Sequence, residues 1–119
     1  MAEHNDLGKI GEEKAIAYLQ NIGFTVLDKN WRYKKAEVDI IAQKGDLLIA
    51  VEVKTRSSLD FGNPQDFVYP KKVKLLVEAV NQYITSKDLD VNLRFDIIAV
   101  YSHNSDFKIE HLEDAFLYF

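Results

Sequence analysis

The chain has 119 residues, which suits one domain, 1–119, with one hydrophobic core. Apolar residues make up 47% of it and charged residues 29%, as in an ordinary globular protein, and cysteine is absent. The composition excludes disulfides, thiolate metal sites and cysteine nucleophiles, and we expect a cytoplasmic protein. The polar N-terminus is unlike a signal peptide and no stretch has membrane-span length, so we expect no membrane partner.

The formal net charge is −4, but the charges are unevenly distributed. Residues 29–74 hold ten basic and six acidic side chains, a net charge of +4, whereas the segments 1–28 and 75–119 carry −3 and −5. A basic middle third can bind a nucleic-acid backbone, and it can equally be a solvated charged surface.

The first predicted element is a helix over residues 6–22, with Asn5 or Asp6 as its N-cap and Gly23 as its C-terminal stop. One arc of this helix gathers its apolar and small residues, which are Leu7, Gly11, Ala15, Tyr18, Leu19 and Ile22. Glu12 lies at the margin of that arc.

Alternating apolar residues predict three strands next, and Lys44-Gly45 is a turn signal between the second and third. The predicted elements are strands over 24–33, 36–43 and 46–55, a loop over 57–70, a helix over 71–86, and strands over 93–101 and 108–112. The order αβββαββ predicts an α/β fold, with a mixed central β-sheet of about five strands and helices on both faces. The apolar end 116–119 is expected to pack on this domain or on a second subunit.

Acidic residues interrupt both strands of the predicted second hairpin. A two-residue loop at Lys44-Gly45 sets Glu37 opposite Glu52 and Asp39 opposite Ala50, whereas a four-residue loop sets Asp39 opposite Glu52. Either register brings Asp39 and Glu52 close together on one face. Strict alternation places Val38, Ile40 and Ala42 on the other face.

Two carboxylates that face each other across a sheet repel, so they need a partner, a raised pKa or a metal ion. With no histidine or cysteine nearby, Asp39 and Glu52 suit Mg²⁺ or Mn²⁺. Such a site fits phosphoryl chemistry, in which Lys54 would hold the attacking water or stabilise the transition state. The alternative that the residues leave open for Glu52 and Lys54 is an edge-strand salt bridge or the solvent face of an antiparallel sheet.

Several segments together carry a family pattern. They are Gly8-Lys9-Ile10-Gly11-Glu12-Glu13-Lys14-Ala15, Asn30-Trp31-Arg32, Glu37-Val38-Asp39-Ile40-Ile41-Ala42, Val51-Glu52-Val53-Lys54-Thr55-Arg56 and Arg94-Phe95-Asp96. On these residues nearly the whole chain resembles the YraN-like family of small bacterial proteins. That family is assigned to the restriction endonuclease-like PD-(D/E)xK fold, close to archaeal Holliday-junction resolvases.

The resemblance implies a metal-dependent phosphodiesterase site. Asp39 and Glu52 match the metal-binding acids, the carbonyl of Val53 would complete the ligands, and Lys54 matches the catalytic lysine. Glu12 matches an additional acid of the resolvase branch. No proline precedes the first acid, which departs from the pattern in the fold's name.

Four basic residues are candidate nucleic-acid contacts, namely Arg32, Arg56, Lys71 and Lys72. Lys71 and Lys72 open a predicted helix, where the helix dipole disfavours lysine, so a phosphate backbone would explain them. Arg56 shares a face with Glu52, and Arg32 lies among aromatic residues that can stack on bases. A solvated surface remains open for Arg56 and a core role for the aromatic residues, and Asp96 is expected to form an ion pair with Arg94.

The leading hypothesis is a Mg²⁺- or Mn²⁺-dependent endonuclease that hydrolyses DNA, including branched or structured DNA. Cutting both strands of a junction would need a homodimer, as in the resolvases that the chain resembles. The alternatives are a non-catalytic nucleic-acid-binding module of the same fold and a metal-free scaffold protein.

Overall fold

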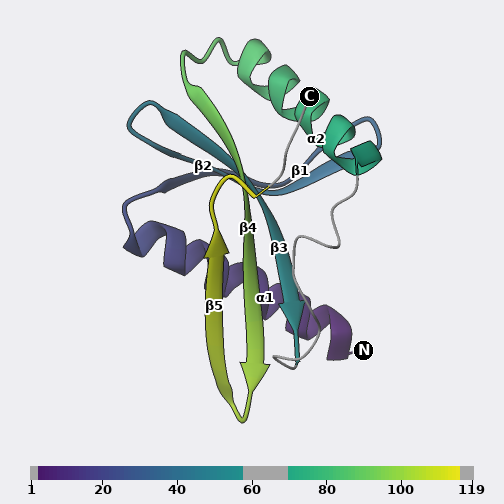
Figure 1. The fold of residues 1–119 in the computed structure, drawn as a ribbon, viewed down its shortest axis with the longest axis vertical. Coiled ribbons are helices and arrows are strands. Elements are labelled where there is room, and N and C mark those ends of the chain that lie inside the picture. The colour runs from purple at the N-terminus through teal and green to yellow at the C-terminus, as the bar shows by residue number, and fades with distance from the viewer. Residues whose placement is uncertain (1–2, 58–69, 116–119) are drawn as a thin grey trace.

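The computed structural model describes residues 3–57 and 70–115 (Figure 1). Within these ranges the order of elements is that expected from the sequence. They are α1 (Glu3–Asn21), β1 (Thr25–Tyr33), β2 (Ala36–Lys44), β3 (Leu47–Arg56), α2 (Pro70–Ser86), β4 (Asn92–His103) and β5 (Asp106–Leu112). Most of the predicted loop and the apolar end 116–119 lie outside the described residues. No helix in the described parts is long and apolar enough to cross a membrane.

The five strands form one sheet in the order β1-β2-β3-β4-β5. Neighbouring strands are antiparallel, except that β3 and β4 run parallel and are joined through α2. The prediction of a mixed five-stranded α/β sheet is therefore confirmed. In Figure 1 the β1–β2 hairpin crosses the direction of β4 and β5, so the sheet is strongly twisted.

Helix α1 begins three residues before the predicted start, so Asn5 and Asp6 are not its N-cap but part of its first turns. An acidic side chain near a helix N-terminus complements the helix dipole, which offsets its modest helix propensity. The predicted stop is correct. Gly23 adopts φ 102°, and the Phe24 and Gly23 N–H groups donate to the carbonyls of Leu19 and Gln20, which is the Schellman pattern.

Each helix covers one face of the sheet. Against α1 pack Phe24, Ile40, Ala42, Ile49, Val51, Ile98 and Val100, together with Ala15 and Leu19 of the helix itself. Against α2 pack Ala36, Val38, Ile41, Leu48, Ala50, Phe95 and Ile97, together with Val73, Leu76, Ala79, Val80 and Tyr83 of the helix itself. The predicted helices on both faces are confirmed, although Ile22, placed on the apolar arc of α1, is 37% exposed.

The β2–β3 turn differs from the prediction by one residue. Lys44 pairs with Leu47, so the two-residue turn is Gly45-Asp46 rather than Lys44-Gly45. Gly45 takes φ 62° at the first turn position, where a type II′ hairpin favours glycine. The resulting register places Asp39 across from Glu52. This is the pairing that the sequence predicted for a four-residue loop.

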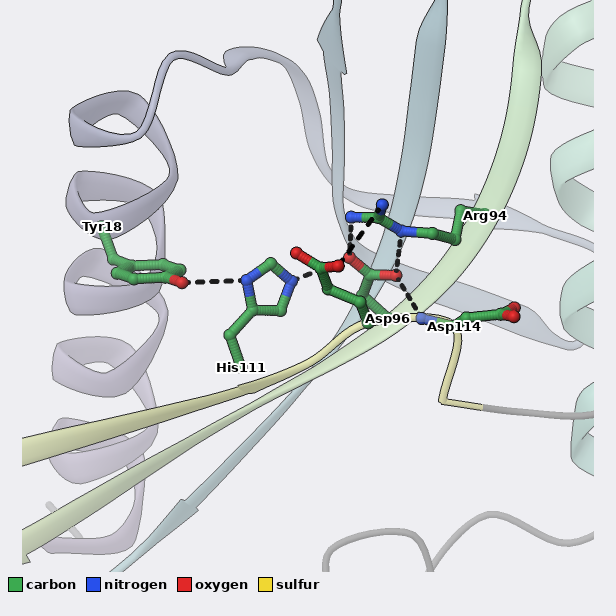
Figure 2. Close-up of polar contacts among 6 residues, drawn as sticks. Tyr18, Arg94, Asp96, His111 and Asp114 are labelled. Carbon is green, nitrogen blue, oxygen red and sulfur yellow. Dashed lines mark hydrogen bonds and ion pairs between the residues drawn. The ribbon is translucent and has the colours of Figure 1, made fainter.

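A polar network fastens the end of β5 to the sheet and to α1 (Figure 2). Asp96 in β4 is fully buried, and the guanidinium of Arg94 donates to both of its carboxylate oxygens at 2.9 Å. His111 Nε2 lies 2.8 Å from Asp96 Oδ2, and His111 Nδ1 lies 3.0 Å from the hydroxyl of Tyr18 in α1. The predicted Arg94–Asp96 ion pair is confirmed, as part of a larger network.

The carboxylate of Asp96 stays ionised because of these donors. Burial alone would raise its pKa, but hydrogen bonds from His111, Arg94 and the Asp114 N–H outweigh burial and lower the pKa below its usual range. An ionised carboxylate only accepts hydrogen bonds, so His111 Nε2 carries the proton that it shares with Asp96. The network thus joins three elements around one buried charge.

We expect Asp96→Asn to lower the free energy of unfolding by about 3 kcal/mol or more at pH 7, because it removes the buried charge that accepts two hydrogen bonds from the Arg94 guanidinium. Glu113→Gln is the matched control, since Glu113 lies 3.8 Å from Arg94 with 63% of its side chain exposed; we expect a loss of at most about 1 kcal/mol. Urea denaturation measures both. The stability that Asp96 contributes is present above pH 4 and is lost as pH falls through its lowered pKa. The difference in stability between the wild type and Asp96→Asn must therefore become smaller in acid.

The close approach of α1 to β3 requires Gly11. A Cβ at this position would overlap the side chain of Thr55, whereas a Cβ at Gly8 would meet nothing within 4 Å. We therefore expect Gly11→Ala to destabilise the protein by about 1–3 kcal/mol, and Gly8→Ala to stabilise it by about 0.5–1 kcal/mol. Thermal denaturation compares the two, and Thr55→Ala should restore most of the stability that Gly11→Ala loses. Equal stability of the two alanine variants would contradict this packing.

Candidate active site

The candidate site forms where β2 and β3 stop pairing. Their ladder runs from Lys44↔Leu47 to Ile40↔Val51. Beyond it, the N–H of Val53 donates to Asp39 Oδ2 at 2.8 Å, so a side-chain carboxylate accepts the bond that a strand carbonyl would otherwise accept. The carbonyl of a strand residue faces the same neighbour as its N–H, which directs the Val53 carbonyl to the side of Asp39 as well.

Asp39 also marks a break in the alternation of β2. Ile40 and Ala42 pack together on the α1 face, but Val38 packs on the α2 face, so the prediction that all three share a face is wrong for Val38. In the neighbouring strand Asn30 lies between the pairs Lys29↔Ile40 and Trp31↔Val38 and adopts φ 52°. The irregular backbone of both strands lets flanking residues reach opposite faces, which strict parity does not anticipate.

Glu52 is held by two lysines from different elements. Its Oε2 lies 3.1 Å from the ammonium of Lys54 in β3 and 2.7 Å from that of Lys72 in the first turn of α2. Only 11% of the Glu52 side chain is exposed, against 13% for Lys54 and 29% for Lys72. The salt bridge that the sequence left open as the alternative for Glu52 and Lys54 is therefore present, and Lys72 joins it.

Helix α1 brings Glu12 to the same place. Glu12 follows Gly11, whose contact with Thr55 sets the distance between helix and strand. An open pocket of about 420 Å³ results, whose walls include Glu12, Asp39, Glu52, Val53, Thr55 and Arg56. The structure thus brings together the acids that were predicted from three separate segments of the sequence.

The pKa of Asp39, one of the acids of the pocket, is clearly shifted. Burial raises its pKa, the nearby charge of Glu52 raises it further, and Glu12 and Glu37 add to the effect. The hydrogen bond from Val53 lowers the pKa in part, and the net result is a value of about 7 instead of 3.8. In the described parts of the chain no basic side chain lowers the pKa of Asp39, and a cation in the pocket would do so.

The chemistry of these donors fits a hard divalent cation. Carboxylate and carbonyl oxygens are the ligands of Mg²⁺ and Mn²⁺, and Asp39, Glu52 and Val53 offer such oxygens. In the described parts of the chain no three acidic, histidine or cysteine side chains converge as a metal site. A cation would therefore bind two carboxylates and a backbone oxygen, with water completing its coordination.

The other predicted contacts are spread more widely. Arg56 lines the pocket and donates from Nη1 to the Thr55 carbonyl at 2.8 Å. Arg32 is 77% exposed and lies 3.6 Å from Glu37 on the adjacent strand. Lys71 is exposed at the start of α2. Lys72, which the sequence also predicts as a phosphate contact, donates a hydrogen bond to Glu52 Oε2 at 2.7 Å.

The signal for Lys72 was present in the sequence, because a lysine in the first turn of a helix opposes the helix dipole. Its partner could not be found in the same way, since Glu52 lies 20 residues earlier in another element. His111, to which the sequence assigned no role, is likewise brought to Asp96 only by the fold.

Comparison with known proteins assigns the chain to a family. Residues 11–100 match the model described as "Uncharacterised protein family UPF0102". The chain belongs to the UPF0102 family. This confirms the resemblance to YraN-like proteins, and the matched segment of this UPF0102 chain contains Glu12, Asp39, Glu52, Lys54 and Lys72.

Similar UPF0102 proteins match over nearly their full length. The chain is 62% identical to one from Flavobacterium psychrophilum over 119 residues, which cover 100% of both chains. It is 56% identical to one from Flavobacterium johnsoniae, again over 100% of both, and 46% identical to one from Bacteroides thetaiotaomicron over 98% of this chain and 96% of the relative. The family is therefore matched across the whole fold.

We expect Asp39→Asn to be more stable than the wild type at alkaline pH when a chelator is present. Because the pKa of Asp39 is about 7 in the folded protein and 3.8 in the unfolded chain, the stability that its carboxyl contributes is fully present below pH 4 and lost as pH rises through 7. Asparagine does not ionise, so the advantage of the variant should reach roughly 2–4 kcal/mol by pH 8. Urea denaturation from pH 4 to pH 8 measures it, and parallel profiles would contradict the raised pKa.

Proposed function

We propose that this UPF0102 chain is a metal-dependent nuclease with a restriction endonuclease-like fold, which hydrolyses phosphodiester bonds in DNA. The observation that carries the proposal is the meeting of Asp39, Glu52 and Lys54 at the place where β2 and β3 separate, with Glu12 beside them. A structural sheet surface has no need to gather three acids in one pocket or to raise the pKa of one of them to about 7.

In the proposed reaction Asp39, Glu52 and the Val53 carbonyl would hold Mg²⁺ or Mn²⁺. The bound cation would lower the pKa of a water molecule and offset negative charge on the phosphate. One water would give up a proton as its oxygen forms a bond to phosphorus. The bond from phosphorus to a bridging sugar oxygen would break, and the leaving oxygen would take up a proton.

The remaining side chains would position the reactants. The Lys54 ammonium would donate to the phosphate or to the attacking water, because it lies 3.1 Å from Glu52, which lines the pocket. Glu12 would accept a hydrogen bond from water on the α1 side. Arg56 on the pocket wall, and the exposed Lys71 and Arg32, would contact phosphates further along the strand.

The substrate class is proposed to include branched or structured DNA. One pocket of this size serves one scissile phosphate, so cutting both strands of a junction requires two copies of the chain. A homodimer is therefore part of the proposal, and sedimentation with and without a four-way junction measures it.

The nuclease assay uses labelled four-way junctions, flaps, single strands and plain duplex with Mg²⁺ or Mn²⁺. We expect Asp39→Asn, Glu52→Gln and Lys54→Met each to reduce cleavage by at least about 100-fold, and Glu12→Gln by about 10–100-fold. Glu13→Gln is the matched control, because Glu13 is the exposed neighbour of Glu12 on the same helix. We expect this variant to cleave as the wild type does.

Two outcomes would overturn the proposal. Cleavage of no substrate with either metal would do so, and retained DNA binding in that experiment would assign a non-catalytic binding module instead. Cleavage by Glu52→Gln at the wild-type rate would also do so, since the activity would then come from elsewhere.

A further inference from the structure

Lys72 stands in the candidate site for a reason that the proposed function leaves unexplained. It lies in the first turn of α2, where no acidic residue balances the helix dipole and a lysine is electrostatically unfavourable. Its ammonium is nevertheless 2.7 Å from Glu52 Oε2, closer than Lys54 at 3.1 Å. Glu52 thus supplies the favourable interaction that offsets the position of Lys72 on the helix.

We propose that Lys72 is an exchangeable counter-ion of the metal site. Its ammonium holds the Glu52 carboxylate in place and releases that carboxylate when a divalent cation binds. This inference rests on the proposed function in one respect, namely that Glu52 is a metal ligand. It adds a positioning residue from α2 and a mechanism by which the protein regulates how tightly the site binds metal.

The competition follows from the contacts of Glu52. A cation on Oε2 would take the lone pairs that now accept from two ammonium groups. A cation on the other oxygen of Glu52 would still lie close to the ammonium groups of Lys54 and Lys72, and like charges at such separations repel. Binding of Mg²⁺ or Mn²⁺ therefore favours withdrawal of one ammonium.

Lys72 is the lysine that can withdraw. Its side chain is 29% exposed, against 13% for Lys54, so it already reaches toward solvent. Lys54 belongs to the same strand as Glu52, two residues away, and moves with it. Lys72 instead extends from a helix on the α2 face through a flexible four-carbon chain, so it can release Glu52 without moving the sheet. The released ammonium then adds a positive charge beside the pocket.

The first test measures Mn²⁺ affinity by calorimetry. Loss of a charge-assisted hydrogen bond that competes with the metal should tighten binding to Lys72→Met by about tenfold relative to the wild type. Lys72→Arg retains the competing charge and should bind as the wild type does. Lys71→Met is the matched control, since it removes the same charge from the same helical turn and should change the affinity by less than about twofold.

The second test uses the wild-type protein and does not depend on the folding of a variant. Acetylation of individual lysines is followed by mass spectrometry with and without saturating Mg²⁺. We expect the rate at Lys72 to rise when Mg²⁺ is added and the rate at Lys71 to stay the same.

The outcomes separate the inference from the proposed function. If wild type and Lys72→Met bind Mn²⁺ equally, with binding lost in Asp39→Asn, the inference fails and the metal site stands. The same conclusion follows if the wild type binds Mg²⁺ and the acetylation rate of Lys72 does not change. If neither protein binds Mn²⁺, both fail. Tighter binding by Lys72→Met alone, together with faster acetylation of Lys72, supports the exchange.

Discussion

The hydrogen bond from the Val53 N–H to the carboxylate of Asp39 governs how this sheet is organised. A buried backbone donor must be satisfied, and here a side chain does so in place of the next strand. The ladder of β2 and β3 can therefore end at Ile40↔Val51 without leaving Val53 unpaired. The separation of the strands makes the pocket, and the same bond fixes the orientation of the acid that lines it. The site is thus a consequence of how the sheet opens.

The charges of the pocket oppose stability, and the two cores offset them. Three acids lie together, and the raised pKa of Asp39 reports the repulsion and burial that result. On either side of the sheet a continuous apolar cluster provides the favourable term, one beneath α1 and one beneath α2. The conflict between local charge and global packing is confined to one end of the β2–β3 ladder, which is typical of functional sites.

Sequence periodicity was sufficient for the fold class, because apolar alternation and the glycine at the end of α1 have local causes. The turn was predicted one residue too early, at Lys44-Gly45 instead of Gly45-Asp46, since both dipeptides contain Gly45. Val38 was misplaced because parity assumes a regular strand, and the irregularity at Asp39 depends on Val53 in another strand. Asp39 and Glu52 could be found by residue type and spacing, whereas Glu12 was found through the family resemblance. The Lys72–Glu52 and His111–Asp96 contacts could not, because they join segments that only the tertiary fold brings together.

The parallel pairing of β3 with β4 also determines which contacts of the site are local along the chain and which are not. Strands β1, β2 and β3 form a meander whose contacts are close along the chain, so little loop-closure entropy opposes them. The pairing of β3 with β4 requires the chain to pass through α2 first, and such non-local contacts form slowly. Asp39 and Glu52 therefore meet across one short turn, whereas Lys72 arrives with the crossover. The two repelling carboxylates are thus close along the chain, whereas the second ammonium that balances Glu52 comes from the crossover helix.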